Sequence, residues 1–287
     1  MDVKSKSKKN EKLTMQTLRL MATNEEKIVA VTAYDYTMAR MMDAGGVDII
    51  LVGDSLGMVV QGHETTLPVD FEDILYHTQC VAKAVKRAHI MADMPFLSYQ
   101  VSHEEAVRNA GLLIKAGAGS VKFEGGEEIG DLVWYLNQIG VPVVAHIGLK
   151  PQCVHTMGGY KIQGRSKAEA DTIINDALTL EEAGASMLLL EGIPMEVAKE
   201  ITETVQIPTL GIGSGPQCKG QILVSYDLLG SNPDFKPRFV RQYLNLYEDV
   251  TNAVGRYVDD VRSSSFPNEA ESFHRNLVEV KPTKKEK

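Results

Sequence analysis

Short apolar runs alternate along the chain with longer stretches that have a helical period. Eight runs rich in Val, Ile and Leu are candidate strands, at residues 27–33, 48–53, 89–93, 120–125, 142–148, 186–192, 207–213 and 221–226. Most positions within a run are apolar rather than alternating with polar ones, which is typical of parallel strands covered on both faces. Between the runs, the spacing of apolar residues predicts helices at 71–87, 103–116, 167–183 and 195–205.

The junctions between these elements indicate how they are connected. In "DAGGVDII", "KAGAGSVKF" and "EAGASMLLL", a helix ends at Gly and a buried strand follows directly, as in a βαβ unit. Eight such units in 287 residues predict an α/β fold of the (β/α)8 TIM barrel type. A doubly wound sheet is the competing architecture, but no G-x-G-x-x-G follows the first run.

The two ends of the chain are expected to differ from the barrel. We expect one barrel domain at 13–274, a disordered basic tail at 1–12 and a second basic tail at 275–287. Within the domain, a helix is expected around 14–22, before the first strand. The stretch 235–261 is expected to be a helical segment that closes the barrel after the last strand.

Charge and cysteine content limit the functional classes. The formal net charge is −8, and the Lys-rich tails leave the central part still more acidic, which argues against nucleic acid as a partner. The three cysteines form no C-x-x-C pair, so we expect a reducing compartment and no disulfide framework. No apolar run approaches the roughly 20 residues of a membrane helix. We therefore expect a cytoplasmic protein that does not interact with membranes.

Polar and charged residues gather where the apolar runs end. They are Asp54, Ser55, Asp93, Lys122, Glu124, His146 and Glu191. Because barrel active sites lie at the carboxyl ends of the strands, we expect these residues around one mouth. The carboxylates of Asp54, Asp93 and Glu124 follow neighbouring strands, and such an all-oxygen set favours Mg²⁺ over Mn²⁺, Ca²⁺ or Zn²⁺. Without a cation, three neighbouring carboxylates would repel one another.

Several motifs carry a resemblance to a known family. They are "TAYDYTMA", "LVGDSLGMVVQGHETTLPV", "YHT", "VKFEGG", "HIGLKPQ", "GGYKIQGR", "LLLEGIP", "IPTLGIGSG" and "GQILV". Over residues 14–274 the chain resembles the 3-methyl-2-oxobutanoate (ketopantoate) hydroxymethyltransferase family. The resemblance implies a Mg²⁺-dependent (β/α)8 barrel that forms a homodecamer. It also implies transfer of a hydroxymethyl group from 5,10-methylenetetrahydrofolate to α-ketoisovalerate, through a Mg²⁺-stabilised enolate, to make ketopantoate in pantothenate and coenzyme A biosynthesis.

The resemblance also implies roles for individual residues. Asp54 and Asp93 would bind Mg²⁺ directly and lie against the substrate through it, with Glu124 in support. Ser55 and Lys122 would bind the keto acid, and Glu191 would be the catalytic base. His146 is expected, from its place at a strand end, to contact the substrate, although a hydrogen bond to its own loop is the alternative. Lys122 has the alternative of forming an imine with the keto acid.

The chain departs from the family pattern after the seventh run. Ser214, Cys218, Lys219 and Tyr226 stand where the family usually has Ala, Thr, Asp and His. We expect Lys219 to lie near the rim that faces the folate. Two other functions remain open: a Mg²⁺-dependent lyase or mutase of the phosphoenolpyruvate mutase/isocitrate lyase type, whose Cys-Gly-His loop the chain lacks, and a non-catalytic assembly protein.

Overall fold

Eight parallel strands form a closed barrel in the order in which they occur in the chain. The structure is a computed structural model that describes residues 11–234 and 236–275. The strands are β1 (Ile28–Thr32), β2 (Ile49–Val52), β3 (His89–Asp93), β4 (Ser120–Glu124), β5 (Val143–Gly148), β6 (Met187–Glu191), β7 (Thr209–Ile212) and β8 (Gly220–Leu223). The predicted (β/α)8 barrel is confirmed. Of the predicted tails, 1–10 and 276–287 lie outside the described residues, so the domain boundaries stay a prediction.

The inside of the barrel is filled by apolar side chains from alternate strand positions. Ile28, Ile49, Met91, Val144 and Leu210 belong to this inner cluster. Helix α2 (Met15–Thr23) begins after Thr14, whose hydroxyl accepts a hydrogen bond from the amide of Thr17. It adds Met15, Leu18 and Ala22 to the inner cluster. The predicted helix before the first strand is therefore confirmed, and it lies against the amino-terminal end of the barrel.

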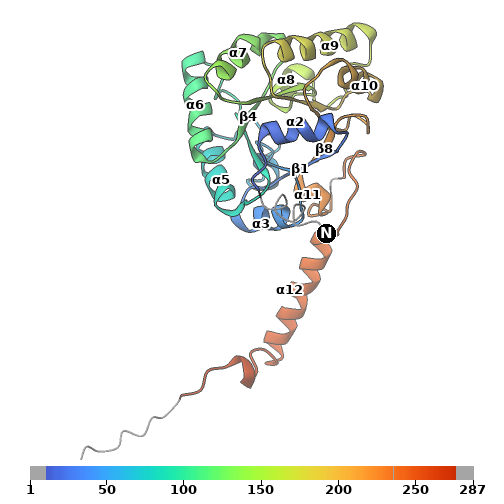
Figure 1. Cartoon of the computed structure of the whole chain (residues 1–287). Coiled ribbons are helices and arrows are strands. Elements are labelled where there is room, and N and C mark those ends of the chain that lie inside the picture. Colours follow the sequence, from blue (N-terminus) through green and yellow to red (C-terminus); the bar gives the residue numbers. More distant parts are fainter. Residues whose placement is uncertain (1–10, 235, 276–287) are drawn as a thin grey trace, which may run out of the picture.

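A ring of helices covers most of the outside of the barrel (Figure 1). These helices are α3 (Tyr36–Ala44), α5 (Phe71–Ala84), α6 (His103–Ala116), α7 (Gly130–Gln138), α9 (Lys167–Glu182) and α10 (Met195–Thr204). Their buried faces and the outward residues of the strands form a second, larger apolar cluster. At the carboxyl end of α6, Gly117 adopts a left-handed conformation with φ 112°, which favours glycine. Four of these helices agree with the predicted ones to within three residues at each end.

Short elements occupy the loops at the carboxyl ends of the strands. They are α4 (Leu56–Val59), the 3₁₀ turn η2 (Glu127–Ile129), the 3₁₀ turn η3 (Pro151–Cys153), α8 (Val154–Met157) and α11 (Ser225–Leu228). The eighth predicted strand was too long, because β8 ends at Leu223 and residues 225–226 begin α11. The connection from β7 to β8, residues 213–219, is fully described and contains no helix.

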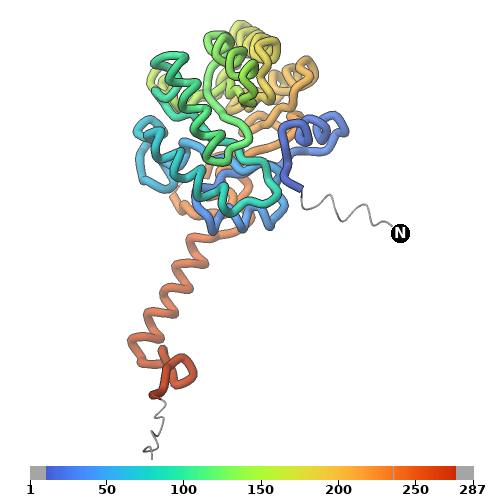
Figure 2. The backbone as a smooth tube through the Cα atoms, turned by 60° about the vertical axis from the view of Figure 1, so that its left-hand side comes forward, coloured from blue at the N-terminus to red at the C-terminus, as the bar shows by residue number. Residues whose placement is uncertain are grey.

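The expectation that the segment 235–261 closes the barrel is wrong. Residues 236–245 contain no helix, and α12 (Leu246–Arg262) begins only after them. In the described part of the chain, α12 buries none of its residues. It extends away from the barrel, as Figure 1 and Figure 2 both show. The expected helical segment is therefore confirmed from residue 246 onward, but the sequence does not say against which surface its apolar face packs.

The outer face of β1 and β8 is left partly uncovered as a result. Val29, the second residue of β1, exposes 49% of its surface, and Gln221 of β8 is also exposed. Parallel strands are normally covered on both faces. Among the described helices, none is long and apolar enough to cross a membrane.

Candidate active site

The fold brings the predicted site residues together at one mouth. Asp93 and Glu124 are the last residues of β3 and β4, and Glu191 is the last residue of β6. Strand register places Asp93 beside Lys122, Glu124 beside His146, and Glu191 beside Gly148. Asp54 and Ser55 follow β2 within three residues. All of these side chains are buried except Ser55 and Glu191, which are half-buried.

An ion pair between Lys122 and Asp93 lies at the centre of the site. The Nζ of Lys122 is 2.6 Å from Asp93 Oδ1, and the backbone amide of Asp54 donates a 2.9 Å hydrogen bond to Asp93 Oδ2. Burial raises the pKa of Asp93 to about 7, and the Asp54 charge adds to this while Lys122 opposes it. Burial lowers the pKa of Lys122, but the carboxylates of Asp93, Asp54 and Glu124 together outweigh it and raise that pKa. Lys122 is therefore a protonated ammonium.

His146 connects the carboxylate cluster to Glu191. Its Nδ1 is 3.7 Å from Glu124 Oε1, and its Nε2 is 3.3 Å from Glu191 Oε2. Neither nitrogen makes a well-aligned hydrogen bond to another described residue. Burial lowers the pKa of His146, although Glu191 opposes the shift, so the ring is neutral near pH 7. Burial raises the pKa of Glu124 well above its ordinary value.

Ser55 is held by a residue from the end of β1. The hydroxyls of Tyr34 and Ser55 are 2.8 Å apart, and Tyr34 is almost completely buried. Nδ1 of His77, on α5, contacts the backbone carbonyl oxygen of Tyr34. Burial raises the pKa of the Tyr34 phenol, so the hydroxyl keeps its proton. Tyr34 thus fixes the position of the Ser55 side chain at the mouth.

Two further residues of the site carried no predicted role. Gln152, in η3, donates from Nε2 to Asp54 Oδ2 at 2.8 Å, and its backbone amide donates to Glu124 Oε2 at 2.9 Å. Tyr99 contacts both the Gln152 amide oxygen and the backbone of Glu124. Gln152 lies within the motif "HIGLKPQ", but it follows no apolar run directly, so the strand-end argument did not select it.

The arrangement of oxygens fits a hard divalent cation. Glu124 Oε1 is buried and makes no well-aligned hydrogen bond to other described residues, and Asp93 Oδ1 is paired with the Lys122 ammonium. Nor do three or more His, Cys, Asp or Glu side chains in the described ranges form a ready metal cage. Mg²⁺ does not require one, because it commonly binds through one or two carboxylates and completes its octahedron with water and substrate oxygens. Asp54 and Asp93 would serve as those two carboxylates.

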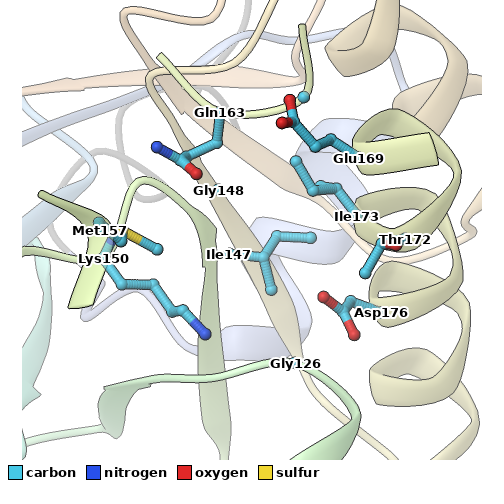
Figure 3. Close-up of a pocket in the computed structure, with 11 residues that line it drawn as sticks. Gly126, Ile147, Gly148, Lys150, Met157, Gln163, Glu169, Thr172, Ile173 and Asp176 are labelled. Carbon is cyan, nitrogen blue, oxygen red and sulfur yellow. The ribbon is translucent and has the colours of Figure 1, made fainter. Parts of the chain in front are cut away.

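A separate cavity of about 210 Å³ lies beside the site, between the end of β5 and α9. Lys150 and Asp176 reach toward it from opposite sides, with Gln163 above them (Figure 3). Ile147 and Ile173 contribute apolar walls. None of the predicted site residues lines this cavity, so it is distinct from the carboxylate cluster.

The four positions that depart from the family pattern lie in different places. Ser214 is buried and donates to the Leu190 carbonyl oxygen at 2.8 Å, and Cys218 is also buried. The ring of Tyr226 lies 5.9 Å from that of Tyr34. Lys219 directly precedes β8, at the amino-terminal end of the barrel, where its Nζ is 2.7 Å from Glu25 Oε1. The expectation that Lys219 faces the rim is wrong. The connection from β7 to β8 contains no helix, and at Lys219 it has already crossed from the mouth to the opposite end of the barrel.

The fold and the site define the chain as a (β/α)8-barrel enzyme with a carboxylate-rich mouth. The family model described as ketopantoate hydroxymethyltransferase matches residues 12–269. The chain therefore belongs to the ketopantoate hydroxymethyltransferase family.

Two relatives and two solved structures give the extent of the similarity. The 3-methyl-2-oxobutanoate hydroxymethyltransferase of Thermoanaerobacter sp. (strain X514) is 51% identical over 92% of this chain and 96% of its own. The 3-methyl-2-oxobutanoate hydroxymethyltransferase of Pelobacter propionicus is 49% identical over 92% of this chain and 98% of its own. A phosphonopyruvate hydrolase in complex with oxalate and Mg²⁺ has a TM-score of 0.60 at 13% identity, covering 90% of this chain and 93% of its own. A phosphoenolpyruvate phosphomutase from Streptomyces platensis subsp. rosaceus has a TM-score of 0.61 at 12% identity, and the match covers 88% of each chain. These two share the fold.

Proposed function

We propose that this protein transfers a hydroxymethyl group from 5,10-methylenetetrahydrofolate to α-ketoisovalerate and so forms ketopantoate for pantothenate synthesis. The observation that carries the proposal is the buried cluster of Asp54, Asp93 and Glu124 beside the Lys122 ammonium, at the mouth of a barrel whose chain is 51% identical to a named transferase. The overall reaction consumes one water and releases tetrahydrofolate.

The first requirement is to hold the keto acid. Asp54 and Asp93 would bind Mg²⁺, which as a Lewis acid would polarise the keto group when bound. Lys122 would pair with the substrate carboxylate as a point charge. Its raised pKa favours this role over imine formation, which needs the neutral amine. Ser55, held by Tyr34 at 2.8 Å, would donate a further hydrogen bond.

The second requirement is removal of the C3 proton. Glu191 has the exposure needed to meet the substrate, with 20% of its side chain accessible. It would take the proton, and His146, 3.3 Å away, would fix the orientation of its carboxylate. The resulting enolate would attack the methylene carbon carried by the folate and form the new carbon–carbon bond. Water would then replace the folate nitrogen on that carbon and leave the hydroxymethyl group.

A direct assay tests this function. Purified protein is incubated with α-ketoisovalerate and methylenetetrahydrofolate, with Mg²⁺ or with EDTA, and ketopantoate is measured by mass spectrometry. We expect product only with the divalent cation. Conversion of phosphonopyruvate to phosphoenolpyruvate, with no ketopantoate formed, would favour the mutase and lyase class instead. Inactivity toward both substrates in protein that still binds Mg²⁺ would favour the assembly protein.

We also propose that the chain works as a cytoplasmic homo-oligomer, with the decamer as the expected state. Five side chains form one apolar stripe along α12 at spacings of three and four residues: Tyr247, Val250, Val254, Tyr257 and Val261. All five are exposed. The partly uncovered face of β1 and β8 is a second surface of the same kind. A further copy of the chain would cover both kinds of surface.

A further inference from the structure

We propose that Gln152 is a positioning residue that orients the carboxylates of Asp54 and Glu124 toward the divalent cation. The inference rests on the proposed function in one respect only, namely that a cation binds at this mouth. It concerns a residue that does not itself bind the cation and does not contact the reacting atoms. Its role is to fix the two carboxylates before the cation arrives.

Gln152 bonds to one oxygen of each carboxylate and leaves the other oxygen available. Its Nε2 donates to Asp54 Oδ2 at 2.8 Å, while its backbone amide donates to Glu124 Oε2 at 2.9 Å. Glu124 Oε1 is buried and accepts no hydrogen bond from another described residue. A carboxylate held by one oxygen can no longer rotate freely, so its second oxygen points in a defined direction. Residues that hydrogen-bond to metal ligands set ligand orientation in this way.

The Gln152 amide is itself fixed in one orientation. Its Nε2 donates a second bond to the Met94 carbonyl oxygen at 3.0 Å, so both amide hydrogens are used. Its Oε1 lies 2.9 Å from the Tyr99 hydroxyl and 3.3 Å from Gln100 Nε2. Turning the amide over would place its oxygen against two acceptors, the Asp54 carboxylate and the Met94 carbonyl oxygen, and its hydrogens against the Gln100 amide nitrogen, a donor. Only the observed orientation satisfies all four contacts.

The chemistry of glutamine suits this position. A lysine would also donate to Asp54, but its positive charge would compete with the cation, as Lys122 already does at Asp93. A glutamate would add another buried negative charge to the site. The neutral amide orients the carboxylate without neutralising it. The side chain is only 4% exposed, so water does not compete for these hydrogen bonds.

The local backbone explains how one residue reaches two strand ends. Gln152 is the middle residue of the 3₁₀ turn η3, which follows β5 and has Pro151 at its first position. The amide of Cys153 donates to the Lys150 carbonyl oxygen at 2.8 Å and closes the turn. The tight turn directs both the backbone amide and the side chain of Gln152 into the mouth. Gln152 thereby links the loops that follow β2 and β3 to the last residue of β4.

Metal binding measured without turnover tests the inference. Mn²⁺ serves as the probe, because free Mn²⁺ gives an electron paramagnetic resonance signal that falls on binding. The variant Gln152→Met keeps the length of the side chain and removes its polar atoms. We expect its Kd for Mn²⁺ to rise roughly 10- to 100-fold. In assays of turnover against Mg²⁺ concentration, the Mg²⁺ needed for half-maximal rate should rise similarly, while kcat at saturating Mg²⁺ falls much less.

Matched variants separate positioning from general damage. Gln138→Met removes an exposed amide at the carboxyl end of α7, at the opposite end of the barrel from the mouth, and its Kd should stay within about twofold of the wild-type value. If Gln152→Met does not fold, Tyr99→Phe provides the test, because it removes one partner of the Gln152 amide and should raise the Kd several-fold.

The outcomes distinguish this inference from the proposed function. A folded Gln152→Met protein, or Tyr99→Phe in its place, with the wild-type Kd for Mn²⁺ would overturn the role of Gln152 and leave the proposed function standing. Wild-type protein that binds no Mn²⁺ would overturn both. Weakened binding in Gln152→Met with normal binding in Gln138→Met supports the inference, whether or not ketopantoate is formed.

Discussion

The charges of individual residues do not balance within the mouth. Asp54, Asp93 and Glu124 are all buried, and the buried Lys122 ammonium forms an ion pair with Asp93. Burying unpaired carboxylates is costly, and the raised pKa values of Asp93 and Glu124 follow from that cost. A divalent cation would remove the imbalance by pairing with the ionised carboxylates.

The first prediction follows from this imbalance and concerns stability. In the metal-free protein the pKa of Asp93 is raised to about 7, above the ordinary value of about 4 that it has when unfolded. The stabilising contribution of the protonated form is therefore complete below about pH 4 and is lost as the pH rises through about 7. Mg²⁺ needs the ionised carboxylate, so it should raise the melting temperature more at pH 8 than at pH 6.

Thermal unfolding with and without Mg²⁺ at the two pH values measures this effect. In Asp93→Asn the Mg²⁺-dependent shift should be small at both pH values, because a ligand is lost, and Asp54→Ala should behave in the same way. Both variants should stay folded and lose activity. A Mg²⁺ shift in Asp93→Asn equal to that of the wild type would place the cation elsewhere.

The second prediction identifies the base. Glu191→Gln keeps the shape of the side chain, so it should still bind Mg²⁺ and α-ketoisovalerate. It should exchange the C3 proton of α-ketoisovalerate with D₂O, in the absence of folate, on the order of 10²- to 10⁴-fold more slowly than the wild type. Proton exchange followed by nuclear magnetic resonance is the measurement. Wild-type exchange in the folded variant would assign the base elsewhere, and neutral His146, 3.3 Å away, would be the next candidate.

Residues at the end of a strand, or directly after it as Asp54 and Ser55 are, were predictable from the sequence, and residues farther along the loops were not. Asp93 and Glu191 each terminate an apolar run, so their place at the mouth followed from the fold alone. Gln152 and Tyr99 lie in loops whose conformation has no periodic signal. Their contacts with Asp54 and Glu124 depend on how several loops meet, which one sequence does not reveal.

At the scale of elements, the barrel depends on α2 at the end opposite the mouth. Leu18 of α2 is fully buried in the inner cluster, whereas Leu20, two residues on, is 57% exposed. The third prediction is that Leu18→Ala lowers the free energy of unfolding by about 2–5 kcal/mol. Leu20→Ala, on the other face of the helix, should stay within about 0.5 kcal/mol of the wild type. Denaturant titration of the two variants measures the difference.

This prediction separates stability from function. Because α2 lies at the amino-terminal end of the barrel, Leu18→Ala should leave the KM for α-ketoisovalerate unchanged at a temperature where the protein is folded. A large rise in KM would mean that α2 also shapes the mouth. Equal losses of stability in Leu18→Ala and Leu20→Ala would show that α2 packs differently from the arrangement described here.

Strands and helices were predicted better than their connections. Eight apolar runs correspond to eight strands, because burial on both faces leaves a clear mark on composition. The connection from β7 to β8 carries no helix, so residues counted forward from "GIGSG" were assigned to the wrong end of the barrel, as Lys219 shows. Strands and helices alternate along most of a (β/α)8 chain. This general pattern does not reveal which single unit lacks its helix.

At the scale of the whole molecule, α12 is the element through which we propose that the chain assembles with another copy of itself. Its five apolar side chains are exposed on a helix that extends from the barrel. Burying a side chain of this size contributes about 1.5–3 kcal/mol, so the stripe is a strong driving force for association. Another protein present in the same cell would also cover the stripe. A second copy of the chain, however, is present wherever the chain itself is made, and at the same concentration.

The last prediction is that α12 is required for assembly. Val250→Glu combined with Val254→Glu places two charges in the stripe and should convert the oligomer to smaller species, down to the 31.5 kDa monomer. Asn252→Glu, on the opposite face of α12, adds a charge outside the stripe and should leave the assembly intact. Light scattering coupled to size-exclusion chromatography measures the masses. A wild-type protein that is monomeric, or a double variant with an unchanged mass, would mean that α12 serves another partner and that β1 and β8 are covered in some other way.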